Sequence, residues 1–222
     1  MNIHYKVLII SLSVFYLISC GSKQKTVDES KGIMSNKPGE VLRLEPGSYS
    51  VLIDSSMVFW EGGKLSGSTH DGNLLLNSGS VTISDSKTIS GEFIVDMTTM
   101  DCLDINNENS KNRLLDHLKS DDFFDVNNHR EASLSINSSK NIGENNFLFS
   151  GDLTIKGITN PVEMKGKISN HIDGYAADIE MSFDRSKYNV KYKSISFFSD
   201  LGDNYILDNI DLSVSILTKK SL

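Results

Sequence analysis

The sequence predicts an all-β domain made of about eight or nine antiparallel strands. Apolar and polar residues alternate with period two from Ser48 onward, which is the pattern of strands with one buried face. Short turn sequences separate the alternating runs, as expected for antiparallel neighbours. An up-and-down barrel and a β-sandwich both fit these two observations.

The clearest alternation lies in the second half of the chain. The long runs cover residues 147–156, 162–168, 175–183 and 209–216, and shorter runs cover 58–62, 74–76, 81–83, 89–97 and 132–136. We expect turns at residues 71–72, 77–79, 143–146, 157–161 and 173–174. One face of the late strands carries Glu, Lys, Asp and Ser, so we expect that face in water and the apolar face inside.

The interior of a barrel of about eight strands is either filled by side chains or just wide enough for one small ligand. Small residues recur among the inward positions, namely Gly62, Gly91, Ala132, Gly151, Gly166 and Ala177. They could leave room for an elongated ligand, or they could mark the bends and bulges that close a barrel.

Ser110–Lys119 departs from the strand pattern and predicts a short helix. Ser110 is a capping residue type, and three leucines at positions 114, 115 and 118 share one face. Phe123 and Phe124 follow directly. The helix and the two aromatic residues either close one mouth of the barrel or form a plug that belongs to its core.

The first nineteen residues have the features of an export signal. A basic start is followed by thirteen mostly apolar residues, Val7–Ser19, fewer than the ~20 needed to span a bilayer. Leu17–Cys20 resembles the bacterial lipobox, which implies cleavage after Ser19 and lipidation of Cys20. We therefore expect a signal peptide at 1–19, a lipidated cysteine with a flexible tether at 20–47, and a barrel domain at 48–222.

Charge and cysteine content restrict the partners. The net charge of −7 disfavours binding to nucleic acid or along an anionic lipid surface. With Cys20 lipidated, Cys102 is the remaining thiol, so the mature chain cannot form an internal disulfide. Asp101 and Asp104 would raise the pKa of Cys102, and we expect this thiol to be inert.

Motifs for catalysis or metal binding are absent from the sequence. It contains no H-E-x-x-H or C-x-x-C zinc spacing, no G-x-S-x-G elbow and no phosphate-binding glycine loop. We therefore predict no catalytic residue, no metal ligand and no cofactor. His117 lies beside the apolar face of the helix. Its ring forms hydrogen bonds either to other groups of the protein or to the head group of a ligand.

Several segments resemble the YceI-like, polyisoprenoid-binding family. They lie in the order expected for the family, at residues 56–62, 91–97, 116–126, 151–162, 183–188 and 197–203. The resemblance covers about Tyr49–Leu217. It implies an antiparallel eight-stranded lipocalin-like β-barrel with a short helix near one mouth, whose apolar channel takes an isoprenoid chain such as a polyprenyl lipid or quinone tail. Residues 129–134 depart from the family pattern, because Pro is missing and Leu134 replaces a Phe.

The resulting hypothesis is a binding or carrier protein for an isoprenoid-type lipid. It would reside in the cell envelope, facing the periplasm or the exterior, with the lipid anchor as its only membrane attachment. The residues expected to line the ligand channel are Val58, Trp60, Phe93, Val95, Leu115, Leu118, Phe123, Phe124, Phe147, Phe149, Ile155, Met164, Ile179, Met181 and Phe183. The alternatives are a structural surface lipoprotein with a filled barrel, and an enzyme that uses His117 with a nearby carboxylate.

Overall fold

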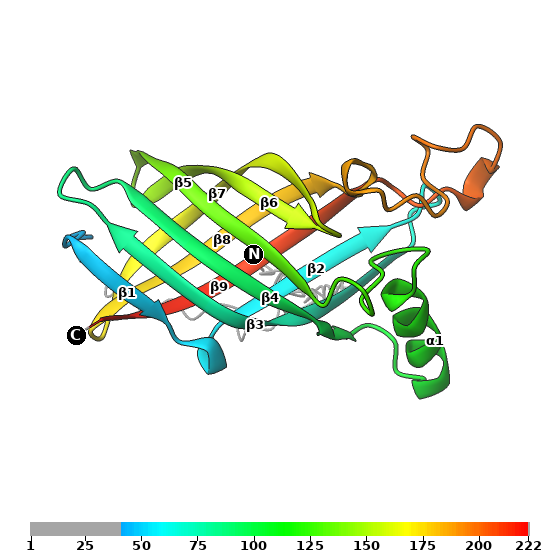
Figure 1. The fold of residues 1–222 in the computed structure, drawn as a ribbon, viewed down its shortest axis with the longest axis horizontal. Helices are drawn as coiled ribbons and strands as arrows, with labels where there is room; N and C mark the ends of the chain where they lie inside the picture. Colours follow the sequence, from blue (N-terminus) through cyan, green and yellow to red (C-terminus); the bar gives the residue numbers. More distant parts are fainter. Residues whose placement is uncertain (1–40, 222) are drawn as a thin grey trace, which may run out of the picture. The chain divides into compact units, whose positions relative to one another are not determined.

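The computed structural model describes residues 41–221 (Figure 1). The predicted signal peptide, Cys20 and residues 21–40 of the predicted tether lie outside the described residues. The α-helix and strands of the described part are β1 Gly47–Val51, β2 Met57–Gly63, β3 Thr69–Ile83, β4 Ile89–Cys102, α1 Glu108–Lys119, β5 Glu131–Gly143, β6 Asn146–Ile155, β7 Ile158–His171, β8 Gly174–Asp184 and β9 Asn209–Lys220.

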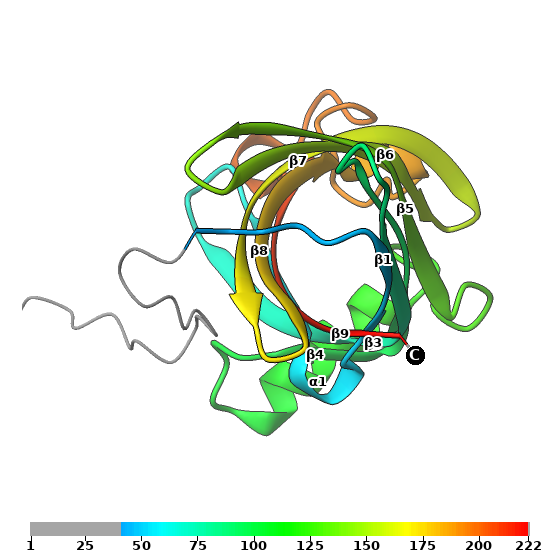
Figure 2. The same ribbon diagram turned by 90° about the vertical axis from the view of Figure 1, so that its left-hand side faces the viewer.

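The strands form a closed antiparallel barrel, which confirms the predicted fold class and rules out the sandwich (Figure 2). The strands β1 and β2 are two parts of one interrupted barrel strand. The first pairs with the end of β3 and the end of β9, and the second pairs with the beginning of β3 and the first half of β9. The nine segments therefore fill eight positions, and pairing of β3 with β4 completes the ring.

The strand β6 shows how the local sequence sets the inward face. Its residues alternate without exception between buried and half-buried, and Phe147, Phe149 and Leu153 are among the buried ones. Lys156 and Gly157 then form the turn to β7, both with positive φ (52° and 72°), as a tight two-residue hairpin requires. The turn is shorter than expected. Pro161 lies inside β7, before the first residue paired with β8, where a missing N–H is tolerated.

The expected turns at residues 71–72 and 77–79 are wrong, because β3 runs unbroken through both. Its register against β4 shifts between Asn73 and Leu75 and again between Leu76 and Ser78. The extra residues of the first shift lie in β4, and that of the second lies in β3. The sequences Asp71-Gly72 and Asn77-Ser78-Gly79 are typical of turns, but here they lie within one continuous strand.

The small inward residues serve both of the expected purposes, some at irregular strand pairing and others beside a cavity. A Cβ at Gly151 would collide with the carbonyl oxygen of Ser135, beside the register shift that follows Ile136. This glycine therefore permits a close approach of two strands. Gly62 and Ala132 instead line an internal cavity.

The two ends of the barrel differ. The long connections 103–130, which contains α1, and 185–208 lie at one end, which we call the helix end (Figure 1). Residues 41–46 cross the other end, which we call the opposite end (Figure 2). There the Tyr175 hydroxyl donates to the carbonyl of Arg43 (2.8 Å) and accepts from the amide of Glu45 (2.7 Å). The last residues of the predicted tether are thus bonded to the barrel.

Candidate ligand-binding cavity

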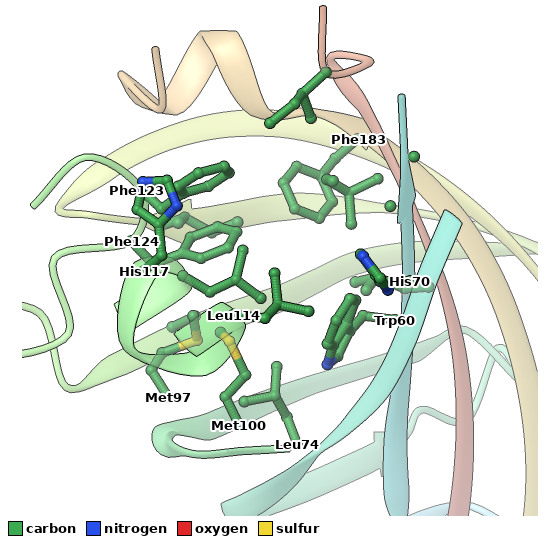
Figure 3. A pocket seen from close by; sticks show the side chains of 18 of the residues that line it. Trp60, His70, Leu74, Met97, Met100, Leu114, His117, Phe123, Phe124 and Phe183 are labelled. Atoms are coloured by element: carbon green, nitrogen blue, oxygen red, sulfur yellow. The ribbon is translucent and has the colours of Figure 1, made fainter. Parts of the chain in front are cut away.

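A cavity of about 340 Å³ occupies the helix end of the barrel (Figure 3). Side chains from β2, β3, β4, β5, β6, β8 and β9 form its walls, while α1 and the 185–208 loop lie at its mouth. The wall is largely apolar, and the volume lies within the range of ~300–1,000 Å³ typical of small-molecule sites. A second, apolar cavity of about 60 Å³ lies toward the opposite end.

The fifteen residues expected to line the channel fall into three groups. Those that line the helix-end cavity are Val58, Trp60, Val95, Leu118, Phe123, Phe124, Ile155 and Phe183. Those that line the small cavity are Phe93, Phe149 and Ile179. The remaining four, Leu115, Phe147, Met164 and Met181, are buried in the core and line neither. The structure therefore brings eight of the fifteen together around one space.

Many residues of the cavity wall were not among the fifteen expected to line the channel. They are Gly62, Gly63, Lys64, Ser68, His70, Leu74, Met97, Met100, Leu114, His117, Ala132, Leu153, Tyr192, Lys193, Ile206, Ile210 and Leu212. Some, such as Leu153 and Leu212, lie on the apolar faces of the alternating runs 147–156 and 209–216 and could have been included from the sequence. Tyr192, Lys193 and Ile206 belong to the 185–208 loop, which carries no periodic signal.

The helix α1 contributes to the cavity mouth through its apolar face. Leu114 and Leu118 line the cavity, while Leu115 packs into the core. The helix begins at Glu108 rather than at the expected Ser110, because the side chain of Asn107 accepts a hydrogen bond from the amide of Ser110 (3.0 Å). At the other end of the helix, Lys119 Nζ donates to the carbonyl of Thr98 on β4 (3.0 Å).

His117 joins α1 to the 185–208 loop at the mouth (Figure 3). Its ring stands nearly perpendicular to those of Phe123 and Tyr192, with centroid distances of 5.1 and 4.4 Å. Its Nε2 lies 3.3 Å from a carboxylate oxygen of Asp122. The side chain is therefore held by aromatic and polar contacts while it also faces the cavity.

Arg185 is fully buried and organises the 185–208 loop. Its guanidinium donates to the carbonyls of Val190, Tyr192, Ile206 and Leu207 at 3.0–3.1 Å. It also forms an ion pair with Asp208 (3.3 Å) and lies over the ring of Phe123. Burial lowers the pKa of the guanidinium and Asp208 opposes this shift. One cation thereby joins the two sides of the loop and supports an aromatic residue of the cavity.

Polar groups gather where the cavity reaches the helix end. Lys64, Ser68, His117 and Lys193 lie there, whereas the wall toward the opposite end is apolar. Trp60 Nε1 is buried and has no hydrogen-bond acceptor among residues 41–221. An amphipathic ligand would thus place its chain inward and its head group at the mouth.

The structure also brings together His70, Cys102 and Asp104, whose potential ligand atoms lie within 4.8 Å of one another. No spacing motif signals this group, because His70 comes from β3 while the other two lie at and beyond the end of β4. The thiol donates to one Asp104 oxygen (3.1 Å), and His70 Nδ1 lies 2.9 Å from the other. Burial, followed by Asp104, raises the pKa of Cys102, so the thiol stays protonated.

Within residues 41–221, no helix is long and apolar enough to cross a membrane.

Comparison with known proteins identifies the family. A family model for the YceI-like domain matches residues 49–217. A UPF0312 protein of Photorhabdus laumondii is 34% identical over 104 residues, which are 45% of this chain and 50% of that protein. A UPF0312 protein of Ectopseudomonas mendocina is 31% identical over 104 residues, or 45% and 51% of the two chains. The match to each of these curated relatives thus spans about half of the relative's length.

Two solved structures share the fold. BcnA of Burkholderia cenocepacia has a TM-score of 0.60 at 18% identity, covering 75% of this chain and 98% of its own. A polyisoprenoid binding domain from Saccharophagus degradans, implicated in plant cell wall breakdown, has a TM-score of 0.53 at 12% identity, covering 78% and 98%. With the family match spanning most of the barrel, this chain belongs to the YceI-like domain family.

Proposed function

We propose that this protein binds an isoprenoid-type lipid, such as a polyprenyl or quinone tail, in the helix-end cavity and carries out no reaction on it. The observation that carries the proposal is an apolar cavity of about 340 Å³ whose polar groups gather at one mouth. A solved structure with the same fold is a polyisoprenoid binding domain, which supports this choice of ligand class.

The free energy of binding would come mainly from the chain. Each CH₂ group removed from water contributes about 0.8 kcal/mol before the cost of ordering the ligand is subtracted. The groups at the mouth, Lys64, Ser68, His117 and Lys193, would orient the head. Such a site recognises a long apolar group with a small polar end.

We also propose that the barrel is attached to a membrane of the cell envelope through lipidated Cys20 and faces the periplasm or the exterior. The support is the export signal and the lipobox-like sequence that ends at Cys20. Several acyl chains together give lasting attachment, whereas one chain alone binds marginally. We expect the Cys20→Ser variant to lose acyl labelling and to leave the membrane fraction. Unchanged labelling of this variant would contradict the proposed anchor.

The binding proposal is tested by native mass spectrometry and solvent extraction of the protein released from a bacterial cell envelope with mild detergent. We expect a stoichiometric prenyl lipid or quinone. Ala132 lines the cavity, so Ala132→Phe should fill it and abolish co-purification. Ser133→Phe adds the same ring at the next residue of β5, which does not line the cavity, and is the matched control. An empty wild-type protein that also fails to bind added isoprenoids would overturn the proposal.

A further inference from the structure

The barrel interior is divided by a layer of side chains between its two cavities. Along β8, Ile179 lines the small cavity, Phe183 lines the helix-end cavity, and Met181 between them lines neither and is 8% exposed. On β9, Val214 has the same place between Leu212 and Ile216.

On β3, Leu76 lies after Leu74, which lines the helix-end cavity, and before Val81, which lines the small one. It belongs to the same core cluster as Met181, and Val214 packs against that cluster. We call Leu76, Met181 and Val214 the partition. These three side chains lie along their strands between the two cavities and line neither, so the helix-end cavity does not continue as an open channel through the barrel.

At the opposite end, residues 43–45 lie across the barrel (Figure 2). Tyr49 donates to the carbonyl of Glu45 (2.8 Å), and its ring packs edge-on against Tyr175 at a centroid distance of 5.1 Å. Together with the two hydrogen bonds of Tyr175, this contact holds residues 43–45 across the barrel, and Leu44 lines the small cavity. A ligand chain that enters at the helix end therefore meets the partition before it reaches the opposite end.

The cavity volume sets the length of chain that fits. An apolar cavity of about 150 Å³ is known to hold benzene, so proportion gives the 340 Å³ cavity room for about 14 non-hydrogen atoms. That is the size of a farnesyl chain. The small cavity, at about 60 Å³, falls below the benzene-sized volume and adds no useful length.

We propose that the site buries a prenyl chain only up to about farnesyl length, and that the partition sets this limit. The inference rests on the proposed function and adds to it the length of chain that the site can bury. Carbons beyond the limit remain at the helix end and bury no further surface. Affinity therefore rises with chain length only until the cavity is full.

The test is a titration of the purified protein with geraniol, farnesol and geranylgeraniol. Trp60, the only tryptophan of the chain, lines the cavity and reports binding by its fluorescence. We expect the Kd to fall by more than about tenfold from geraniol to farnesol, because five more carbons leave water. From farnesol to geranylgeraniol it should change by less than about twofold, because no further carbon is buried.

Removing the partition should extend the site. In Met181→Ala the two cavities would join, and geranylgeraniol should then bind more tightly than farnesol. The matched control is Ile168→Ala, which enlarges the small cavity but leaves the partition in place. Leu76→Ala opens the partition from β3 and serves as a second variant if Met181→Ala fails to fold, as judged by circular dichroism.

The outcomes separate the two proposals. A wild-type Kd that continues to fall through geranylgeraniol, or a folded partition variant that behaves like Ile168→Ala, would overturn the length limit and leave prenyl binding intact. Failure of all three alcohols to bind would overturn prenyl binding itself, and the length limit with it.

Discussion

Arg185 shows how one side chain can determine the shape of a functional surface. A planar guanidinium presents several donors in fixed directions, and here those donors reach four carbonyls on both sides of the 185–208 loop. The same loop supplies Tyr192, Lys193 and Ile206 to the cavity. The position of these three residues therefore depends on a residue that does not line the cavity.

We expect Arg185→Ala to lower the free energy of unfolding by about 3–5 kcal/mol, because it leaves Asp208 without its buried cation and several carbonyls without a donor. Arg113→Ala, on the exposed face of α1, is the control and should change stability by less than about 0.5 kcal/mol. Urea denaturation measures both. Equal stability of the two variants would show that the guanidinium does not organise the loop.

At the scale of the element, α1 depends on a cap that lies before the helix predicted from the sequence. The side-chain oxygen of Asn107 accepts from the amide of Ser110, so Ser110 is the third residue of the helix rather than its cap. A cap satisfies an amide that has no partner within the helix. The start of the helix, and with it the placement of the apolar face, is fixed at Asn107.

We expect Asn107→Ala to cost about 1 kcal/mol of stability, the usual effect of removing a helix cap. Ser110→Ala is the matched control and should have little effect, because alanine is a good former of helix interiors. Thermal unfolding distinguishes them. A larger loss in Ser110→Ala than in Asn107→Ala would restore the helix start expected from the sequence.

At the scale of the whole barrel, its two ends have different roles. The helix end carries the cavity and its polar groups, and the opposite end is closed through Tyr49 and Tyr175. Burial, followed by the neighbouring hydroxyl of Tyr175, raises the pKa of Tyr49 far above its usual value. Burial also raises the pKa of Tyr188, which lies near the helix end. The folded barrel therefore favours the neutral form of both phenols.

This preference predicts a loss of stability at alkaline pH. A phenol whose pKa is higher in the folded state stabilises the fold below its unfolded pKa of about 10, and this contribution disappears as the pH rises further. We expect the melting temperature to fall above about pH 10, and less steeply in Tyr49→Phe. Tyr205→Phe, in the 185–208 loop, is the control. Parallel curves for wild type and Tyr49→Phe would contradict a role for Tyr49.

Much of the barrel follows from the sequence because strand periodicity is a local property. The alternation in β6, from Phe147 to Ile155, correctly identifies the inward face, since successive side chains of a strand point to opposite sides. The motif resemblance also led to the family that the comparison shows. In β3, by contrast, turn-type residues such as Gly72 and Gly79 suggested chain reversals, whereas pairing with β4 keeps the strand continuous through both.

The alternation in the sequence by itself determined an all-β fold and the inward face of most strands, and its motifs indicated the family and, through it, the barrel. Only the tertiary structure decided which inward residues share a cavity. Phe183 and Met181 are both apolar residues at inward positions of β8, yet Phe183 lines the helix-end cavity and Met181 belongs to the partition. The physical reason is that the depth of a residue in a barrel depends on the stagger between strands and on the loops at its ends, and these are set by contacts between residues far apart in the chain.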